Sequence, residues 1–369
     1  MKNNFIPLYR PSISKQEIIN VKTCLNEGWI SSKGKFVSSF EKEFKKKFGY
    51  KYATVTINGT AALHLALLSL NIKPGDEVIV PNITFVASVN AISYVRAKPI
   101  LVDINKKTWL MDISEIKKKI TKKTKAIILV HLYGFAYSQK DILYLKNKYK
   151  LKIIEDCAEA IGSKYNNKFV GSLSDISTFS FYGNKTISTG EGGMVVVKKK
   201  NLLKKIVFLK SQGLNIYKSK NFYNHEIIGY NYRMTNICAA IGLAQLKKID
   251  LFIKRKKKIF QLYKKILKNQ VTFQEQINDT ISTYWLVTIL VKNKITRIKL
   301  QKYLNDNNIE TRPIFTPMHK LNMYKNPKKN FVNSTYICDL GISLPSYPDL
   351  KEKEIKFICS KIKKFLNNN

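Results

Sequence analysis

The chain of 369 residues is long enough to bury a large core and to form two domains. Its 65 Lys and Arg against 25 Asp and Glu give a formal net charge of +40. These residues are spread along the whole chain without a helix-turn-helix, RNA-binding or zinc-finger motif, which favours a solvated basic surface over specific nucleic-acid binding. Such a surface would attract an anionic small substrate.

The sequence contains no run of the ~20 apolar residues that a membrane helix needs, and its first residues lack the apolar stretch of a signal peptide. Its cysteines are odd in number and never form a CxxC pair: Cys24, Cys157, Cys238, Cys338 and Cys359. This usage suits a reducing compartment and argues against a disulfide framework or a zinc site. We expect a cytoplasmic protein with no metal and no membrane partner.

Short runs rich in Val and Ile alternate with helical patterns: "ATVTI", "DEVIVP", "PILVDI", "AIILVHLYG", "KIIEDC", "ISTFSF" and "GGMVVV". This order predicts an α/β fold with a mostly parallel sheet covered on both faces. A long helical stretch follows from "MTNICAAIGLAQL", then a strand in "STYWLVTILV", another helix and a Pro-rich passage. We therefore expect a large α/β domain over residues 1–245 and a smaller domain over residues 246–369.

Two places follow early strands, where sites collect in such sheets. In "NGTAALHLALLSL", Gly59 and Thr60 open a helix whose free N–H groups could seat a phosphate, although an ordinary capping turn has the same pattern. In "VPNITFVASVNAI", Phe85 could cover a planar ligand or could pack in the core.

The third place is "LKIIEDCAEAIGS", where Asp156 ends an apolar strand. A carboxylate there must find a partner or leave the core, so it could pair with a cationic ring nitrogen or could cap a turn. The small Ala158 would leave room for a flat ring, and Glu159 could reach a substituent on that ring.

The fourth place is "STFSFYGNKTISTGEGG". Alternation along its strand puts Thr178 and Ser180 on one face, from which Ser180 could bind phosphate. Lys185 follows in a loop of Gly, Asn and Thr, where an amine can be held and partly desolvated, as a carbonyl nucleophile must be. A solvated loop lysine is the alternative.

Together the four places supply a phosphate seat, a ring cover, a carboxylate for a pyridinium nitrogen and an amine for an aldehyde. Pyridoxal 5′-phosphate requires this set of groups. The sequence therefore predicts a site for this cofactor, with Asp156 and Lys185 at the ends of consecutive strands of one sheet.

The segments "NGTAALHLAL", "GDEVIVPNITFVAS", "EDCAEAIGS", "FSFYGNKTISTGEGGM" and "GYNYRMTNICAAIGLAQL" resemble the nucleotide-sugar aminotransferases of the DegT/DnrJ/EryC1/StrS family. The resemblance covers nearly the whole chain. It implies a pyridoxal-phosphate-dependent transferase of fold type I, with a mostly parallel seven-stranded sheet, a smaller C-terminal α+β domain and homodimeric assembly.

The resemblance also implies roles for individual residues. Lys185 would bond to the cofactor aldehyde and move a proton between Cα of glutamate and C4′ of the cofactor, while Asp156 would keep the pyridinium nitrogen protonated. The other implied cofactor contacts are Gly59, Thr60, Phe85, Ala158, Glu159, Ser180 and, toward the phosphate of the partner subunit, Asn231. The implied substrate contacts are Trp29, Ser31, Arg312 and His319.

The reaction implied is transfer of the amino group of L-glutamate to C4 of a nucleotide-linked 4-keto-6-deoxyhexose. The expected substrate is GDP-4-keto-6-deoxymannose, which would give GDP-perosamine for a surface polysaccharide. A UDP- or dTDP-linked 4-keto-6-deoxyglucose, giving a viosamine product, is the alternative within the family. A non-catalytic nucleic-acid-binding protein with the same fold is the alternative from another class.

Overall fold

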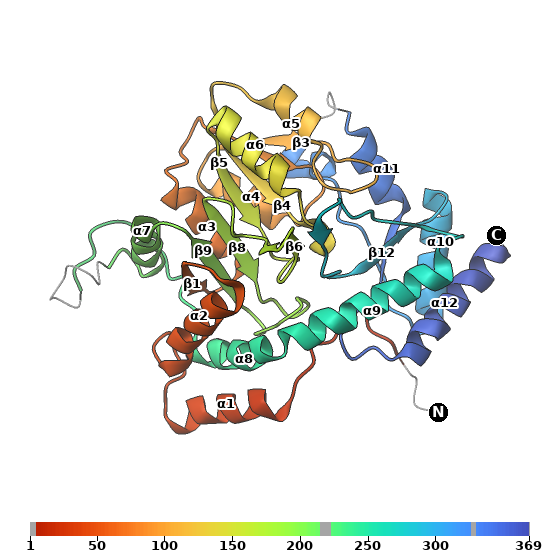
Figure 1. Ribbon diagram of the computed structural model, residues 1–369, viewed down its shortest axis with the longest axis horizontal. Helices are drawn as coiled ribbons and strands as arrows, with labels where there is room; N and C mark the ends of the chain where they lie inside the picture. The colour runs from red at the N-terminus through yellow and green to blue at the C-terminus, as the bar shows by residue number, and fades with distance from the viewer. Residues whose placement is uncertain (1–4, 215–222, 326–329, 369) are drawn as a thin grey trace.

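The computed structural model describes residues 5–214, 223–325 and 330–368 (Figure 1). A seven-stranded sheet lies at its centre. In spatial order its strands are β1 (Tyr52–Thr56), β9 (Gly193–Val197), β8 (Ile176–Ser180), β5 (Lys152–Asp156), β4 (Thr124–Val130), β2 (Glu77–Pro81) and β3 (Lys98–Val102).

Six of these strands run in one direction and β9 runs against them. The pairs β2–β3, β2–β4, β4–β5 and β5–β8 are parallel, whereas β9 is antiparallel to both β8 and β1. The carboxyl ends of β1, β2, β5 and β8 consequently lie along one edge of the sheet. The predicted α/β class and the mostly parallel sheet are confirmed.

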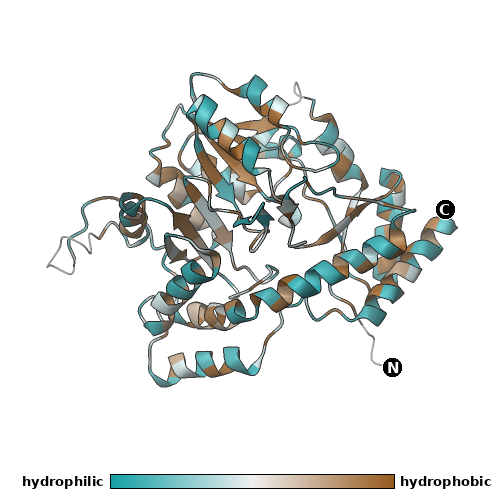
Figure 2. Cartoon of the chain, viewed as in Figure 1, coloured by the Kyte–Doolittle hydropathy of each residue, from teal (hydrophilic) through white to brown (hydrophobic). Residues whose placement is uncertain are grey.

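Alternate residues of each strand enter two separate cores, as the pleat of a strand requires. In β2, Ile79 packs into the core on one face, and Val78 and Val80 pack into the core on the other. Because both faces are covered, apolar residues occupy both sides of the central strands, and brown stretches mark them in Figure 2.

Helices from different parts of the chain cover the two faces. The helices that contribute to the core around Val78 are α3 (Gly59–Ser69), α4 (Ala87–Tyr94) and α7 (Lys200–Lys210). The helices that contribute to the core around Ile79 include α1 (Lys15–Asn26), α2 (Lys35–Phe48), α5 (Ile113–Lys119), α6 (Gln139–Tyr149) and α8 (Asn236–Lys247). In α2 the buried side chains are phenylalanines at every fourth position, Phe36, Phe40, Phe44 and Phe48, so they form one apolar stripe.

A smaller antiparallel sheet follows the long helix α9 (Ile249–Leu267), which runs diagonally across the molecule in Figure 1. Its strands, in spatial order, are β10 (Thr272–Phe273), β12 (Val287–Leu290), β14 (Gly341–Leu344) and β13 (Arg312–Pro313). The helices of this part are α10 (Lys294–Asp306), α11 (Val332–Leu340) and α12 (Glu352–Asn367). A C-terminal α+β unit, as predicted, accompanies the large sheet.

A third, short sheet joins the two parts of the chain. Its strands are β11 (Thr280–Ile281), β6 (Lys164–Tyr165) and β7 (Lys168–Phe169), and all of its pairs are antiparallel. Three single turns of 3₁₀ helix complete the described elements: η1 (Leu132–Gly134), η2 (Met318–Lys320) and η3 (Asn322–Tyr324).

The strand predicted in "STYWLVTILV" is shorter than its apolar run. Only Val287–Leu290 forms β12, because the residues before it dock on the large sheet instead of pairing in the small one. Tyr284 adopts a left-handed φ of 53°, and the N–H of Trp285 donates to the carbonyl of Tyr133 at 2.9 Å. This docking carries Trp285 to the edge of the large sheet.

The N-terminal segment also lies against the C-terminal part of the chain. Ile6 forms a parallel bridge with Ile309, and the N–H of Leu8 donates to Glu310 Oε2 at 2.9 Å. The division of the chain at residue 245, which lies in α8, stays a prediction. None of the helices in the described ranges has the length and apolarity needed to cross a lipid bilayer.

Candidate active site

Residues singled out from the sequence meet at the carboxyl edge of the large sheet. Asp156 and Ser180 are the last residues of the neighbouring strands β5 and β8. Gly59 begins α3 just after β1, Phe85 follows β2, and Lys185 lies in the loop between β8 and β9. The parallel order of the strands therefore brings together segments that are far apart in the sequence.

Gly59, at the start of α3, packs tightly against Ser180 at the end of β8. A Cβ atom at Gly59 would lie 2.9 Å from Cβ of Ser180, so no larger residue fits without displacement. The side chain of Asn58 caps α3 by accepting the N–H of Ala61 at 2.8 Å. The N–H groups of Gly59 and Thr60 precede the first intrahelical bonds, so they are available to an anion beside Ser180.

Asp156 is a buried carboxylate, 5% exposed, that is held by two donors. Its Oδ2 accepts from the hydroxyl of Ser88 at 2.7 Å and its Oδ1 accepts from the N–H of Ala158 at 3.1 Å. Burial raises the pKa of this carboxyl, and the hydrogen bond from Ser88 opposes that rise. Each oxygen can accept a further hydrogen bond, so Asp156 can still receive the N–H of a cationic ring.

Lys185 is 9% exposed, and its amine lies 3.6 Å from Oε1 of the buried Glu159. Burial lowers the pKa of Lys185, and the charges of Glu159 and Asp156 oppose this. Burial raises the pKa of Glu159 to about 7, although the charge of Lys185 opposes this rise. A partly desolvated amine beside a carboxyl that exchanges protons near neutrality suits nucleophilic attack on a carbonyl.

Two aromatic residues that sequence reasoning missed hold the loop of Lys185. The indole Nε1 of Trp285 donates to the carbonyl of Asn184 at 2.7 Å, and the hydroxyl of Tyr9 donates to the carbonyl of Lys185. The amine of Lys185 lies 3.8 Å from the centroid of the Trp285 ring, which is within the range of a cation–π contact. Neither residue is near Lys185 in sequence, so no local pattern could have indicated them.

Phe85 is 55% exposed, so the interpretation that it packs in the core is wrong. Its ring meets Phe315 edge to face, with the centroids 5.9 Å apart. Phe315 in turn lies nearly parallel to Tyr133, whose N–H donates to Glu159 Oε2 at 2.8 Å. An exposed ring in the segment after β2 can cover a flat ligand.

Trp29 and Ser31 lie at the start of α8, because both of their carbonyls accept hydrogen bonds from Asn236. The side chain of Asn236 donates to Trp29 at 2.7 Å and its backbone N–H donates to Ser31 at 2.6 Å. The indole of Trp29 is half exposed. Within the described ranges no hydrogen bond joins either residue to Lys185 or Asp156.

The remaining predicted residues lie on separate segments. His319 reaches the end of β2, where its Nδ1 lies 2.9 Å from Nδ2 of Asn82. Arg312, in β13, forms an exposed ion pair with Glu310 at 3.2 Å. Asn231 is exposed and accepts a hydrogen bond from Arg233. Among the residues that the structure describes, Arg312 and Asn231 form no hydrogen bond with Lys185 or Asp156.

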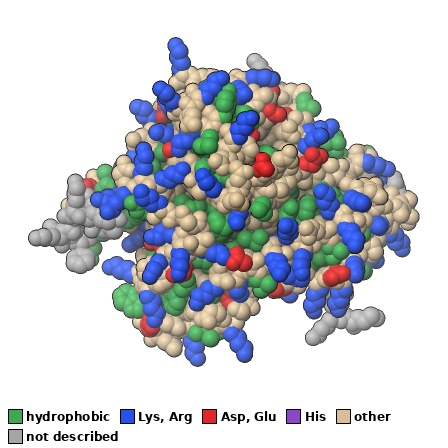
Figure 3. Space-filling model, in the orientation of Figure 1, with side chains coloured by type: hydrophobic (Ala, Val, Ile, Leu, Met, Phe, Trp, Pro, Cys, Tyr) green, Lys and Arg blue, Asp and Glu red, His purple; other side chains and the backbone are tan. Residues whose placement is uncertain are grey.

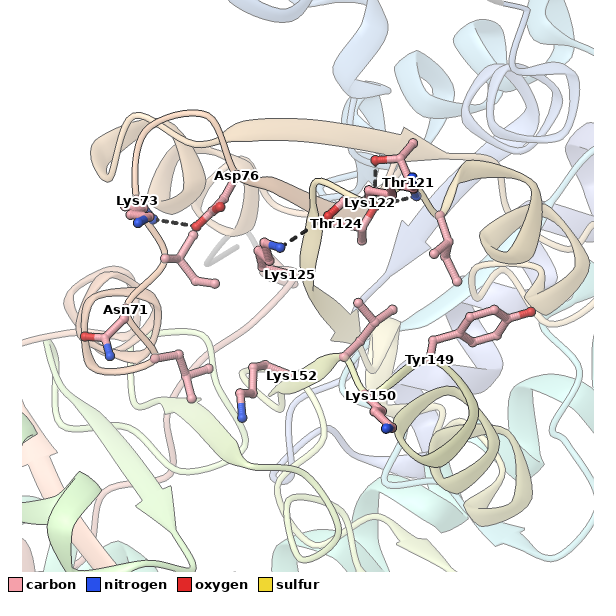
Figure 4. Close-up of a pocket in the computed structure, with 14 residues that line it drawn as sticks. Asn71, Lys73, Asp76, Thr121, Lys122, Thr124, Lys125, Tyr149, Lys150 and Lys152 are labelled. Carbon is pink, nitrogen blue, oxygen red and sulfur yellow. Dashed lines mark hydrogen bonds between the residues drawn. The ribbon is translucent and has the colours of Figure 1, made fainter.

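A cavity of about 500 Å³ opens at the opposite edge of the sheet (Figure 4). Lys125 and Lys152, which lie near the amino ends of β4 and β5, line it together with Lys73, Lys122 and Lys150. Lys125 is already engaged with the carbonyl of Lys122 at 3.2 Å. Gly59, Phe85, Asp156, Ser180 and Lys185 lie at or after carboxyl ends of strands, and none of the predicted residues lines this cavity, so it is not the site that they form.

One buried group has the side chains of a metal site: His131, Glu155 and Cys157, whose ligand atoms lie within 4.8 Å of one another. Its carboxylate is already engaged, because Glu155 accepts from Nε2 of His131 at 3.0 Å and from the N–H of Gly171 at 3.0 Å. Hydrogen bonding explains this group, and the absence of a metal stays a prediction.

Pyridoxal 5′-phosphate fits the groups at the carboxyl edge. The absence of a side chain at Gly59 keeps the N-terminus of α3 close to the hydroxyl of Ser180, and the free N–H groups there suit a phosphate. Asp156 offers an acceptor to a pyridinium N–H, and Lys185 offers an amine to an aldehyde. This correspondence places the protein in the class of pyridoxal-phosphate-dependent transferases.

The chain belongs to the DegT/DnrJ/EryC1/StrS aminotransferase family, which it matches over residues 11–363. It is 49% identical to the GDP-perosamine synthase of Escherichia coli O157:H7, with 99% of each chain covered. It is 43% identical to the GDP-perosamine synthase of Vibrio cholerae, with 98% of this chain and 99% of that chain covered.

Solved structures agree with this assignment. The putative sugar aminotransferase Spr1654 from Streptococcus pneumoniae in its PMP form has a TM-score of 0.93 at 27% identity, covering 99% of this chain and 98% of that chain. The same protein in its PLP form has a TM-score of 0.92. The predicted fold type, enzyme class and cofactor are confirmed, whereas the roles of individual residues remain to be proposed.

Ser88 is a site residue that sequence reasoning missed but could have found. It lies three residues after Phe85 in "VPNITFVASVNAI", at the start of α4. Ser88 follows β2, which is separated from β5 and Asp156 by the single strand β4. A hydroxyl at this position can therefore donate to the carboxylate of Asp156.

Proposed function

We propose that this protein transfers the amino group of L-glutamate to C4 of GDP-4-keto-6-deoxymannose and so makes GDP-perosamine. The observation that carries the proposal is the 49% identity to a GDP-perosamine synthase along the whole chain. The buried lysine and carboxylate at the carboxyl edge support it, because amino transfer requires both.

Lys185 is the catalytic base in this proposal. Bound pyridoxal phosphate supplies an aldehyde for amine exchange and a ring that accepts electron density from the reacting carbon. Lys185 would hold the cofactor through its amine, and the same amine, when free, would move the proton between Cα of glutamate and C4′. Its lowered pKa leaves a larger share of the amine unprotonated and able to accept that proton.

Other residues bind and orient. Asp156 keeps the pyridinium nitrogen protonated, and Gly59, Thr60 and Ser180 bind the phosphate. Phe85 and Ala158 would contact opposite faces of the ring, and Glu159 would lie near its phenolic oxygen. The substrate contacts in this proposal are Trp29, Ser31, Arg312 and His319. The exposed guanidinium of Arg312 suits an anionic diphosphate.

The protein acts as a homodimer in the cytoplasm, where Asn231 of each subunit serves the phosphate of the other. The exposure of Asn231 supports this, since the residue is free to meet a second chain. The five unpaired cysteines suit a reducing compartment. The product is destined for a surface polysaccharide.

A subunit-mixing experiment tests the composite site. Lys185→Ala and Asn231→Ala subunits should each be inactive alone. Mixed and allowed to exchange, they should recover up to about a quarter of wild-type activity per subunit, because half of the subunits pair as heterodimers that each have one intact site. Activity of the mixture is measured after native mass spectrometry has shown exchange.

Mixing Lys185→Ala with Lys185→Arg subunits is the matched control, since no pairing of these two variants can rebuild an intact site. Equal activities in the two mixtures despite demonstrated exchange, with Asn231→Ala inactive alone, would contradict the composite site.

A substrate comparison tests the proposed reaction. GDP-4-keto-6-deoxymannose, UDP-4-keto-6-deoxyglucose and dTDP-4-keto-6-deoxyglucose are incubated separately with enzyme and L-glutamate. The GDP sugar should be turned over with a kcat/KM at least about tenfold above the others, a difference of about 1.4 kcal/mol in transition-state binding. Preference for a UDP or dTDP sugar would favour the viosamine-type alternative.

Family membership does not favour a non-catalytic nucleic-acid-binding protein. Lys and Arg are scattered over the face shown in Figure 3 and are not gathered into one stripe. The charge of this face acts as a general attraction for the anionic sugar nucleotide.

A further inference from the structure

Lys256 is a buried lysine of α9 that the proposed reaction does not use. Its side chain is 1% exposed, and its amine donates to the carbonyls of Trp285 and Ser346, each at 2.8 Å. Among the described residues no carboxylate forms an ion pair with it. Burial lowers the pKa of Lys256 to about 7.

The contacts of Lys256 lead to Lys185 by two routes. The first passes through Trp285, which Lys256 holds by its backbone carbonyl and whose ring lies 3.8 Å from the amine of Lys185. The second passes through Tyr9: the amine of Lys256 lies 5.1 Å from the centroid of its ring, and its hydroxyl donates to the carbonyl of Lys185. Both aromatic residues that hold the Lys185 loop are therefore in contact with Lys256.

A purely structural role explains this lysine poorly. Burying an amine without a carboxylate partner is costly, so a lysine at this position calls for a reason beyond filling space. The neighbouring Arg255 already ties α9 to the segment after β14, through the carbonyls of Pro348 and Leu350 at 3.1 and 3.0 Å. Lys256 adds a hydrogen bond to the carbonyl of Trp285 and a contact with the ring of Tyr9.

We propose that Lys256 is a positioning residue for Lys185: by holding the backbone of Trp285 and facing the ring of Tyr9, it sets where the amine of Lys185 lies. This inference rests on the proposed function, in which that amine bonds to the cofactor. Displacement of the indole would move the face on which the amine rests and loosen the bond between Nε1 and the carbonyl of Asn184. The reach of the amine and its proton affinity would change together.

Lys256→Met tests the proposal, because methionine fills most of the same space without donors. The matched control is Lys210→Met, since Lys210 is also buried and donates to two oxygens, Thr54 Oγ1 at 2.6 Å and the carbonyl of Val55 at 2.7 Å. One readout is the rate at which the apoenzyme captures pyridoxal phosphate covalently, followed by its visible absorption. The other is the pH midpoint of that absorption in the loaded enzyme.

In Lys256→Met we expect capture to slow by about tenfold or more, since a misplacement of about 1 Å can cost a reaction about 10²-fold. The pH midpoint should shift as well. Lys210→Met should keep the wild-type rate and midpoint, even where its melting temperature falls. Lys256→Arg, which retains donors, should recover part of the capture rate.

Trp285→Phe and Tyr9→Phe keep the test decisive should Lys256→Met fail to fold. Each removes one hydrogen bond to the Lys185 loop and leaves Lys256 in place, so each should shift the pH midpoint in the same direction. Wild-type capture and midpoint in Lys256→Met, or in both aromatic variants, overturn the positioning role. Borohydride labelling of Lys185 in the wild type tests the proposed function separately, and its failure would overturn both.

Discussion

Lys185→Ala should lower amino transfer by about 10⁴-fold or more while the protein still binds pyridoxal phosphate. The loss is large because, in the proposed mechanism, Lys185 is both the nucleophile that holds the cofactor and the base that moves the proton. Binding should persist because the variant leaves the N-terminus of α3, Ser180 and Asp156 untouched, which are the proposed contacts to the phosphate and the ring nitrogen.

Absorbance distinguishes the two states of the cofactor. The variant should show the spectrum of the free aldehyde, whereas the wild type shows that of the lysine-bonded form. Borohydride followed by peptide mass analysis should label a wild-type peptide containing Lys185 and leave the variant unlabelled. A label on any other lysine would refute the assignment.

Lys185→Arg is the matched control. Arginine keeps a positive charge beside Glu159, but its guanidinium stays protonated and so cannot act as a nucleophile or a base. It should therefore be as inactive as Lys185→Ala. Substantial activity in Lys185→Arg would show that the charge, and not the amine, is what the site needs.

Asp156→Asn should lower kcat by about 10²- to 10⁴-fold with little change in fold. The amide fits the same space, and its oxygen can still accept the N–H of Ala158. It carries no charge, so the ring nitrogen loses its proton and the ring no longer draws electron density from the reacting carbon. Steady-state kinetics with glutamate, together with circular dichroism, measures the effect.

Ser88→Ala is the graded control for Asp156. It removes one donor at 2.7 Å and leaves the charge in place, so we expect a loss of about tenfold. Wild-type turnover in Asp156→Asn would show that the cofactor does not meet this carboxylate. A loss in Ser88→Ala as large as in Asp156→Asn would mean that orientation of the carboxylate, and not its charge, dominates.

The sequence by itself determined the large sheet and the four strand ends that carry the site. Runs of Val and Ile separated by helical patterns favour a mostly parallel sheet covered on both faces, and parallel strands place their carboxyl ends on one edge. Asp156 and Lys185 could be singled out as candidates because a carboxylate ending a buried strand, and a lysine among small residues, are locally unusual. The candidates for the site were therefore visible in short segments, and the structure brings them to one edge of the sheet.

Only the tertiary structure decided what surrounds Lys185. Trp285 reaches it because residues before β12 leave the small sheet and dock on Tyr133, against the apolar pattern that predicted one continuous strand. Tyr9 comes from the N-terminal segment and Lys256 from α9, and the two meet beside the loop of Lys185. The exposure of Phe85 likewise depends on how distant segments pack around it. Such contacts join residues far apart in sequence, and their energies depend on packing and burial that no local pattern encodes.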